Sequence, residues 1–401
     1  MTERQNNVRE NSFWLLSARV TVQVLSVIFS AIVVRKLGVD EFGQYAFIAS
    51  LVLIGNTFSS FGTDTFLIRE IARTGTVGDI ASRSLALQLF LTLLYLGAML
   101  FIPRSGLMIF SFTLLPLTLI SVNGAVFRAF GRMDLSAYIG VFSNILQVIA
   151  ALLSRDLITL CYFLLIQHLI VMSLSYALSR GSLPTYNLFQ PVDFRPIFRP
   201  VLPFATLTIF FVIFHRLGVI SVSLLLGDSS TGFFSSAARV VDGLKFGHYS
   251  ILGALLPAIS SGTVRSWQNF RKAFFLLLSS SFVLAFFTTV FSRYIVLILF
   301  GAEFEDVSGY LSLMVWSLLP YTVSSFISYA LIARGHETQV VKTALISVLI
   351  SIVLYFGLIQ TNGLVGAIWA TVLGEVFGVI VSGWYYVRFS DQEKVDEEAA
   401  A

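Results

Sequence analysis

Three features of the sequence predict an all-α polytopic membrane protein with about 12 transmembrane helices. Of the 401 residues, 56% are hydrophobic and only 12% are charged, whereas soluble domains carry about 25% charged residues. About 12 stretches are apolar over the roughly 20 residues that a helix needs to cross a bilayer. The longest polar or mixed segments, 62–83 and 179–202, are shorter than a globular domain, which needs about 50 residues. The composition therefore excludes an ordinary soluble enzyme.

The expected spans follow one another with short polar breaks. The first is expected to be a retained helix rather than a cleaved signal, because it is long and contains Arg19. The lone cysteine, Cys161, lies inside an apolar stretch and cannot form an intrachain disulfide. The spans are residues 12–34, 42–61, 84–102, 107–129, 136–153, 158–178, 203–226, 232–257, 273–300, 309–332, 339–359 and 364–387.

The positions of Lys and Arg predict the orientation of these spans. An even number of spans places both ends of the chain on one side of the membrane. The termini and the even-numbered connections hold 17 Lys and Arg residues, against 5 on the opposite side and 4 inside spans. Because basic residues are retained in cytoplasmic loops, both termini are expected to be cytoplasmic.

An internal repeat relates the two halves of the chain. The entries to the second and eighth spans read LGVDEFGQYA and LGDSSTGFFSSA. At both the fourth and the tenth spans a glycine follows 15 positions after the proline of a Leu-Pro pair. Because six is even, two six-helix halves share one orientation, as in alternating-access transporters with a cavity at the repeat interface. The corresponding residues are Gly38 and Gly227, Gly43 and Gly232, Tyr45 and Phe234, Pro116 and Pro320, and Gly131 and Gly335.

The repeat predicts four segments. They are an N-terminal six-helix lobe at 1–181, a cytoplasmic linker at 182–202, a C-terminal six-helix lobe at 203–388 and an acidic cytoplasmic tail at 389–401. Five of the nine prolines lie between Ser182 and Pro203, which favours an extended, semi-rigid linker.

Ionisable residues at bilayer depth are the best indicators of function, because they are costly and face a cavity or a partner. The eighth span contains RVVDGLK, which places Arg239, Asp242 and Lys245 three residues apart on one helix face. One interpretation is a structural pair in which Asp242 neutralises either neighbour. The other is a cavity lining, since one positive charge remains.

Other spans add further charges. The seventh contains His215 and Arg216, and the first contains Arg19, which could also reach the headgroups. Together with Arg239 and Lys245 these arginines oppose two carboxylates, Asp242 and Glu375, so the embedded residues sum to +2. A cavity lined in this way favours an anion, because Arg and Lys are suited to bind phosphate groups.

Two further residues are candidates for ion coupling. Glu375 lies near the middle of the twelfth span and could bind a proton or Na⁺, or it could be a neutral acid that hydrogen-bonds a neighbouring helix. His168, in the sixth span, has a side chain suited to proton transfer, although a packing role fits a lone histidine equally. Metal-ligand spacing and phosphate-binding glycine loops do not occur in the sequence, so no metal or cofactor is expected.

The segment FGTDTFLIREIAR, residues 61–73, closes the second span. Its apolar residues alternate with charges in a way that suits a short interfacial helix. The alternative interpretation is a positively charged anchor for the topology.

Longer runs carry a resemblance to a known family. They are Asn11 and Trp14 at the opening of the first span, RKLGVDEFGQYAFIASL from Arg35, FGTDTFLIREIAR, and LGDSSTGFFSSAARV from Leu226 followed by Pro257. Together they resemble Wzx-type polysaccharide (O-antigen or exopolysaccharide) flippases of the multidrug/oligosaccharidyl-lipid/polysaccharide exporter superfamily. The resemblance implies two helical lobes around a central cavity that faces the two sides of the membrane alternately.

The resemblance also implies a substrate and partners. The substrate class is an undecaprenyl-diphosphate-linked oligosaccharide, moved from the cytoplasmic to the outer leaflet of a bacterial inner membrane for cell-surface polysaccharide such as lipopolysaccharide. Expected partners are this lipid, membrane lipids, and polysaccharide polymerase and chain-length regulator proteins, with no nucleic acid. By position, the residues that would hold the diphosphate and sugar are Arg19, Arg216, Arg239 and Lys245. The chain departs from the family at Arg216, where many members have an acidic residue.

Two other function classes compete with this prediction. A drug or organic-cation antiporter of the same superfamily would favour an acidic cavity, whereas the embedded charges here are basic. A membrane polymerase, ligase or glycosyltransferase would need a sizeable outer-face loop and a catalytic acid pair, which the sequence does not contain. The sequence therefore predicts a transporter rather than an enzyme.

Overall fold

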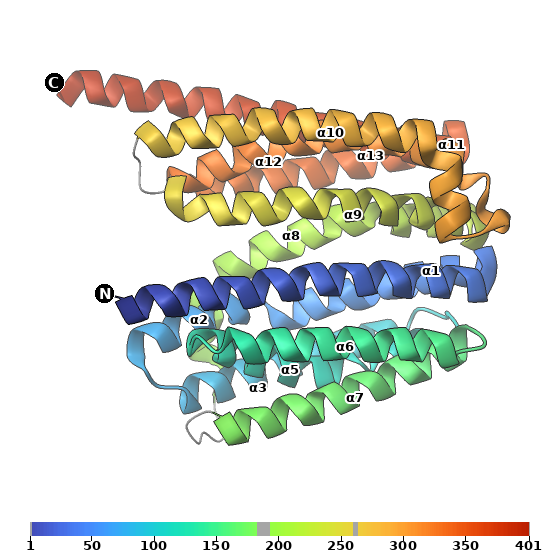
Figure 1. Ribbon diagram of the computed structural model, residues 1–401, viewed down its shortest axis with the longest axis horizontal. Coiled ribbons are helices and arrows are strands. Elements are labelled where there is room, and N and C mark those ends of the chain that lie inside the picture. Colours follow the sequence, from blue (N-terminus) through green and yellow to red (C-terminus); the bar gives the residue numbers. More distant parts are fainter. Residues whose placement is uncertain (1, 183–192, 260–263, 401) are drawn as a thin grey trace. The chain divides into compact units, whose positions relative to one another are not determined.

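The computed structural model describes residues 2–182, 193–259 and 264–400, and in these ranges it contains helices and no β-strand (Figure 1). Two short 3₁₀ segments, Ala302–Phe304 and Val315–Ser317, precede α11 and α12. The α-helices are α1 (Thr2–Ser60), α2 (Thr63–Thr74), α3 (Gly78–Met99), α4 (Leu107–Ser111), α5 (Leu114–Ala129), α6 (Met133–Leu153), α7 (Leu157–Ser182), α8 (Arg195–Leu226), α9 (Asp228–Ile259), α10 (Val264–Leu299), α11 (Val307–Met314), α12 (Leu318–Ala333) and α13 (Glu337–Ala400).

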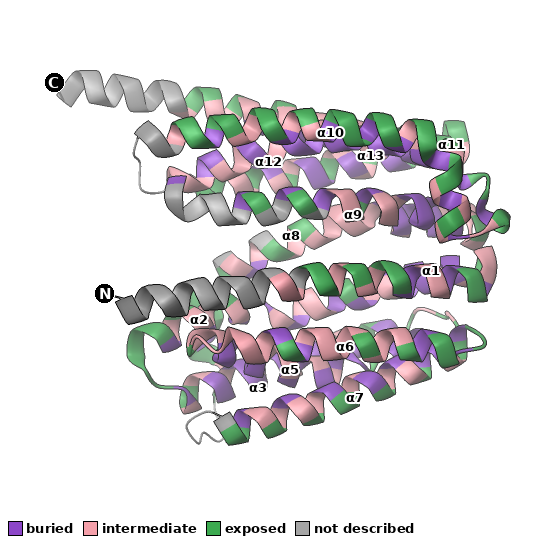
Figure 2. Cartoon of the chain, in the orientation of Figure 1, coloured by how far each residue is buried: buried purple, intermediate pink, exposed green. Residues whose placement is uncertain are grey.

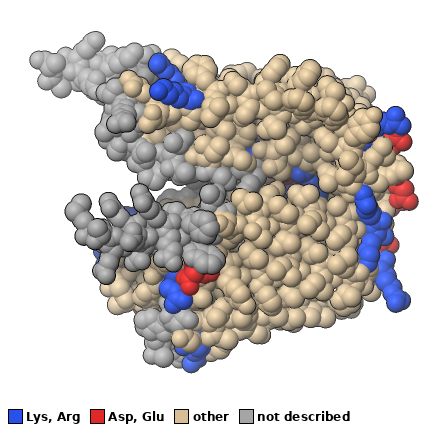
Figure 3. Space-filling model, viewed as in Figure 1, with Lys and Arg blue, Asp and Glu red and all other residues tan. Residues whose placement is uncertain are grey.

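The all-α fold with about 12 spans is confirmed. Among the described residues, nine helical segments are long and apolar enough to cross a membrane, and two of them, Val20–Thr74 and Glu337–Phe389, each contain two predicted spans. Helix α9 is not one of these nine segments and carries charged residues in its middle. It corresponds to the eighth predicted span. On the face drawn in Figure 3, most charged side chains lie near helix ends and uncharged atoms cover the middle. This distribution suits a hydrocarbon layer about 30 Å thick.

Glycines separate the paired spans within the two longest helices. The backbone of α1 is interrupted at Gly38, with φ 69° and ψ −175°, and that of α13 at Gly363, with φ 56° and ψ −134°. These positive φ values are readily adopted only by glycine. Each glycine therefore marks the turn between two spans that the sequence predicts as separate helices.

The chain divides into two compact units, unit 1 (Met1–Val212) and unit 2 (Ile213–Ala401). Helix α8 contributes its first part to unit 1 and its second part to unit 2. Residues 183–192 of the expected linker lie outside the described residues, and 195–202 form the first turns of α8 rather than an extended strap. Pro196 is tolerated there because backbone N–H groups in the first helical turn have no partner within the helix. Ile197 and Val201 are buried in unit 1 and stabilise this helical start.

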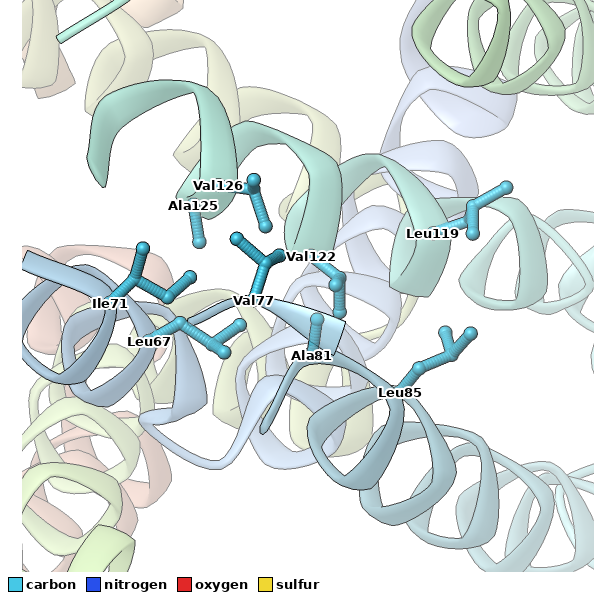
Figure 4. Packing of buried hydrophobic residues seen from close by; sticks show 9 residues of the cluster. All are labelled: Leu67, Ile71, Val77, Ala81, Leu85, Leu119, Val122, Ala125 and Val126. Carbon is cyan, nitrogen blue, oxygen red and sulfur yellow. The ribbon is translucent and has the colours of Figure 1, made fainter. Parts of the chain in front are cut away.

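Unit 1 buries the amphipathic helix α2 against α3 and α5 (Figure 4). A helix is present over most of residues 61–73, as the sequence predicts, and its buried apolar residues Leu67 and Ile71 are four apart on one face. Val122 and Val126 of α5 face them, and Ala81 of α3 allows a close approach. Arg69 and Arg73 lie on the exposed face, whereas Asp64 faces α5 and accepts a hydrogen bond from the hydroxyl of Ser121.

The turn between α1 and α2 requires glycine. Phe61 has φ 46° and the following Gly62 has φ 70°, so two successive residues adopt the left-handed region that L side chains rarely occupy. A Cβ atom at Gly62 would lie 2.6 Å from Cβ of Phe204 and 2.7 Å from the backbone nitrogen of Ala205. The close approach of α8 to this turn is therefore possible only without a side chain at residue 62.

The repeated residues adopt the same local conformations in the two units. Gly38 and Gly227 both precede a span with positive φ, 69° and 83°, and Gly131 and Gly335 both end one, with φ 71° and 80°. Helices α5 and α12 each have 16 residues and begin one residue before the Leu-Pro pair. The sequence repeat therefore corresponds to a structural repeat within the described residues.

In unit 2, α9, α10, α12 and α13 pack around an apolar cluster near the beginning of α10. Phe270 lies 4.9 Å from Phe326 between ring centroids, and Phe274 lies 5.1 Å from the same ring. Figure 2 shows buried residues on the inner faces of these helices and exposed residues on the outer face of α10. The exposed side chains of α10 are largely apolar, as expected for contact with lipid.

Candidate functional site

Unit 2 contains a cavity of about 60 Å³ among α8, α9 and α13. A cavity of this volume holds a few water molecules, since one water needs about 10–15 Å³ of such space. The ionisable residues that line it are His215, Arg216, Asp242, Lys245 and Glu375. Five of the eight candidates from the sequence are therefore brought together in one site.

Small residues allow the three helices to approach one another here. A Cβ atom at Gly218 of α8 would lie 2.6 Å from the hydroxyl oxygen of Tyr355 and 2.8 Å from the ring of Phe234. A Cβ at Gly374 of α13 would lie 2.9 Å from Oγ of Ser351. The glycines thus leave room for the polar side chains that line the cavity, and a larger residue would displace them.

A buried ion pair joins α9 to α13 at the cavity. Nζ of Lys245 lies 2.7 Å from Oε1 of Glu375, and the two side chains are only 11% and 8% exposed. The ammonium also lies 4.6 Å from the ring centroid of Tyr321 on α12, where the negative face of the ring attracts it. Removing one partner would leave an uncompensated charge in a medium of low dielectric constant, which is strongly destabilising.

Arg216 supplies a second cation whose hydrogen bonds are incomplete. Its Nε is buried and has no hydrogen-bond partner among the described residues. A buried donor without an acceptor costs free energy, and each such group in a folded protein requires an explanation. An anion entering the cavity would supply the missing acceptor.

One interpretation of the sequence is a structural ion pair in which Asp242 neutralises Lys245 or Arg239. The observed ion pair of Lys245 is different. Glu375 is the partner of Lys245, while Asp242 lines the cavity with an exposed side chain. The lining therefore has two cations and two carboxylates and a formal charge of zero, in place of the expected embedded charge of +2. The difference arises because Arg239 is not among the lining residues and the side chain of Arg19 is outside the part of the chain that the structure describes.

Of the other three candidates, Arg239 and His168 lie outside the cavity lining, and the third is Arg19. Arg239 is one helical turn before Asp242 on α9 and is not in the lining. His168 belongs to α7 of unit 1, where Nδ1 lies 2.7 Å from the carbonyl oxygen of Leu164 in its own helix. That contact is the packing role named as its alternative. The side chain of Arg19 lies outside the described residues.

Some residues of the site carry no signal that sequence reasoning could use. Tyr355 and Thr371, both on α13, are joined by a hydrogen bond of 2.9 Å between their hydroxyl oxygens in the wall of the cavity. His248, one turn beyond Lys245 and outside the cavity lining, has Nε2 2.7 Å from Oγ of Ser281. A hydroxyl or a lone histidine in a span is common, so only the packing of three helices identifies these. The sequence points to His248 only through its three-residue spacing from Lys245, which predicts that both lie on one face of the helix.

The described residues contain no group of three or more His, Cys, Asp or Glu side chains arranged to hold a metal ion. The ionisable groups that line the cavity are a guanidinium, an ammonium, an imidazole and two carboxylates. Such a set can bind an ion and exchange partners within ion pairs.

A family model described as "Polysaccharide biosynthesis protein" matches residues 8–263, more than half of the chain. The chain belongs to this family. A second model, described as "Lipid II flippase MurJ", matches residues 240–395, which include most of α9 and all of α13 up to its last turns. No curated protein matches the chain.

Solved structures share the fold of this polysaccharide biosynthesis family member. An inward-facing multidrug resistance MATE transporter of the MOP superfamily has a TM-score of 0.77 and 15% identity, with 95% of this chain and 99% of that chain covered. The lipid II flippase MurJ in an inward closed conformation has a TM-score of 0.72 and 17% identity, covering 92% and 87%. A MOP superfamily transporter from Pyrococcus furiosus has a TM-score of 0.68 and 14% identity, covering 94% and 95%. The chain is therefore a multi-pass membrane protein with the MOP superfamily fold.

Proposed function

We propose that the protein moves an undecaprenyl-diphosphate-linked oligosaccharide from the cytoplasmic to the outer leaflet of a bacterial inner membrane, for O-antigen or exopolysaccharide synthesis. Membership of the polysaccharide biosynthesis family, over residues 8–263, is the observation that carries the proposal. The family model for a lipid II flippase over the C-terminal part supports a lipid-linked substrate. Polysaccharide polymerase and chain-length regulator proteins are its proposed partners.

Arg216 is the proposed contact for the substrate diphosphate. Its buried Nε lacks an acceptor among the described residues, and a guanidinium can hold a phosphate with two fixed hydrogen bonds. The cavity of about 60 Å³ holds only a few waters, so the diphosphate would enter in a more open conformation. A substrate that binds the open conformation more tightly would shift the population toward it.

The ion pair of Lys245 and Glu375 is the proposed link between substrate and a coupling ion. When Glu375 takes up a proton or Na⁺, its carboxylate no longer neutralises Lys245. The positive charge of the Lys245 ammonium then becomes available to the diphosphate. When the substrate leaves, the pair re-forms and displaces the ion. Each ligand thus changes the affinity for the other through the same ammonium, as thermodynamic linkage requires.

The function is tested in vesicles that contain the purified protein and a labelled undecaprenyl-diphosphate oligosaccharide in one leaflet. We expect the glycan to become accessible on the other side faster than in vesicles without protein. The same vesicles loaded with a fluorescent organic cation provide the comparison. Movement of the cation without movement of the glycan would reject the flippase proposal.

Coupling is tested separately in the same vesicles by varying pH, Na⁺ and membrane potential one at a time. We expect Glu375→Gln to abolish the dependence on the coupling ion, because an amide neither titrates nor binds Na⁺ as a carboxylate does. An unchanged ion dependence in this variant would remove Glu375 from the mechanism.

A cation antiporter of the same superfamily is the second candidate. The two carboxylates of the cavity, Asp242 and Glu375, could attract an organic cation, and the fold of MATE transporters is similar. Against this, the ammonium of Lys245 already neutralises Glu375. The vesicle assay with both substrates separates the two candidates.

A further inference from the structure

The cavity of unit 2 has the charges for two ion pairs but contains one. Apart from His215, its ionisable lining consists of two cations, Arg216 and Lys245, and two carboxylates, Asp242 and Glu375. Lys245 is paired with Glu375 at 2.7 Å. Arg216 and Asp242 each lack a hydrogen bond or ion pair among the described residues, and Nε of Arg216 is buried. One cation and one carboxylate of the lining are therefore not joined in this conformation.

The backbone places Arg216 and Asp242 close enough to pair. They belong to α8 and α9, which meet at the turn of Gly227. At 1.5 Å per residue, Arg216 lies about 16 Å and Asp242 about 22 Å from that turn, so their heights differ by about one helical turn. Oppositely charged side chains one turn apart on a helix face form pairs. The two helices also approach closely near Arg216, since a Cβ atom at Gly218 would lie 2.8 Å from the ring of Phe234.

An unpaired guanidinium is costly once the substrate has left. The argument rests on the proposed function, in which the substrate diphosphate neutralises Arg216. After release, the empty protein has to return through conformations in which the cavity is closed to water, where an uncompensated charge costs several kcal/mol. Glu375 is already held by Lys245. Asp242 is thus the carboxylate of the lining that remains for Arg216.

We infer that Asp242 is the counter-ion of Arg216 while the empty protein returns. When the diphosphate is bound, repulsion between its charge and the carboxylate keeps Asp242 apart from Arg216. When the diphosphate leaves, the guanidinium pairs with Asp242 and the cavity closes without a net charge on that pair. Asp242 is in this sense a positioning residue for Arg216 and acts on the return step rather than on the step that carries the substrate.

The test compares net movement of the glycan lipid with exchange, in the vesicles already described. Net movement is measured with labelled lipid in one leaflet and no substrate in the other, so the protein must return empty. Exchange is measured with unlabelled lipid added to the second leaflet, so the protein can return loaded. We expect Asp242→Asn to slow net movement at least about tenfold, the effect of losing one close charge pair. Unlabelled lipid in the second leaflet should restore most of the rate.

Two further variants support the comparison. Asp242→Glu should recover most of the net movement, because a carboxylate remains. Asp306→Asn is the matched control, since it makes the same chemical change in the same unit at an exposed residue that does not cap α11 with its side chain. We expect native rates of net movement and exchange in this control. Asp242→Asn should also melt with the native protein, because its carboxylate has no partner among the described residues.

Four results would overturn the assignment to Asp242. They are native net movement in Asp242→Asn, a loss in this variant that unlabelled lipid does not restore, the same selective loss in Asp306→Asn, and a selective loss in Glu375→Gln together with native rates in Asp242→Asn. The last result would assign the counter-ion to Glu375. If the native protein shows neither net movement nor exchange of the glycan, the proposed function itself fails, and the role of Asp242 fails with it.

Discussion

Units 1 and 2 share a helical repeat but differ in what they bury. The interior polar contacts of unit 1 are mostly between neutral groups: Gln88 donates to Thr63 at 2.7 Å, Asn123 to Ser175 at 3.3 Å and Gln167 to Ser143 at 2.9 Å. Unit 2 buries the charged pair of Lys245 and Glu375. Glycines with positive φ at equivalent positions show that the backbone plan is common to both. The two units therefore share a backbone arrangement and differ in the side chains that it carries.

The physical chemistry of the membrane gives this difference a meaning. Neutral hydrogen bonds between spans stabilise packing at modest cost, whereas an ionised side chain at bilayer depth is expensive and is found where a substrate or ion passes. Hydrophobic residues of similar volume often replace a buried ion pair without loss of stability. Lys245 and Glu375 are thus expected to serve transport, and the contacts between neutral groups in unit 1 to serve packing.

The largest expected effect comes from breaking the buried pair of unit 2. Lys245→Met should lower the free energy of unfolding by about 3–5 kcal/mol, because the carboxylate of Glu375 would remain buried without its cation. The double variant Lys245→Met/Glu375→Leu should recover most of that loss while abolishing transport. Thermal unfolding in detergent measures the first effect and vesicle transport the second. A double variant no more stable than Lys245→Met would contradict the pairing.

The next effect concerns unit 1 and has an internal control. Gly62 and Gly75 both have φ of 70°, so an alanine at either position meets the same backbone penalty of about 1 kcal/mol. Only at Gly62 would the new Cβ also collide with Phe204 and Ala205, whereas open space surrounds Gly75. Gly62→Ala should therefore destabilise by about 1–3 kcal/mol more than Gly75→Ala. Equal melting temperatures for the two variants would show that α8 does not pack against this turn.

A similar pair of variants examines the cavity. Gly218→Ala places a methyl group against Tyr355 and Phe234, while Gly357→Ala adds one to open space on α13. Overpacking should cost about 1–3 kcal/mol in the first variant, and the second should be neutral or slightly stabilising, because alanine favours helix by about 1 kcal/mol over glycine. We also expect Gly218→Ala to impair transport. Full transport by a folded Gly218→Ala protein would argue against this cavity as the site.

The smallest effect lies in the connection between α6 and α7. Asp156 accepts hydrogen bonds from the backbone N–H and the hydroxyl of Thr159, at 2.8 and 2.9 Å, and these bonds lower the pKa of its carboxyl group below the ordinary value of 3.8. A lowered pKa means that the ionised form stabilises the folded state. This contribution is present above the ordinary pKa and disappears as the pH falls through the lowered one.

Asp156→Asn should therefore lower the melting temperature slightly at neutral pH. The difference from the native protein should shrink as the pH falls below about 4. Melting curves of both proteins across this range provide the check. A difference in melting temperature that grows toward low pH would contradict the stabilising role of the ionised Asp156 carboxylate.

The positions of the spans can be predicted from sequence because each one reflects a local run of apolar residues. The turn at Gly38 is likewise signalled by its repeat at Gly227. The partner of Lys245 cannot be predicted, since Glu375 is 130 residues away and the pairing depends on how α9 packs on α13. Asp242, three residues from Lys245, is the nearer carboxylate in sequence but not its partner in the structure.

The start of α8 shows a second limit. Prolines between Ser182 and Pro203 predict an extended linker, yet residues 195–202 are helical. Local composition favours the linker, but burial of Ile197 and Val201 in unit 1 stabilises the helix. Tertiary packing therefore decides the conformation where local signals are weak.

The central claim is that Arg216 serves substrate binding rather than folding, and one comparison tests it most directly. Arg216→Ala removes a buried donor that has no acceptor among the described residues, so the variant should fold at least as stably as the native protein. Arg132→Ala, in unit 1, removes a partly exposed arginine that lies 2.9 Å from Asp134, and such a surface pair contributes about 1 kcal/mol or less.

Translocation of the labelled undecaprenyl-diphosphate oligosaccharide is measured in vesicles for both variants, alongside their melting temperatures. We predict that Arg216→Ala loses translocation by about 100-fold, as expected when a charged group that binds phosphate is removed, while it melts no lower than the native protein. Arg132→Ala should translocate normally. Normal translocation by Arg216→Ala, or a loss matched by a lower melting temperature, would contradict a role of Arg216 in substrate binding.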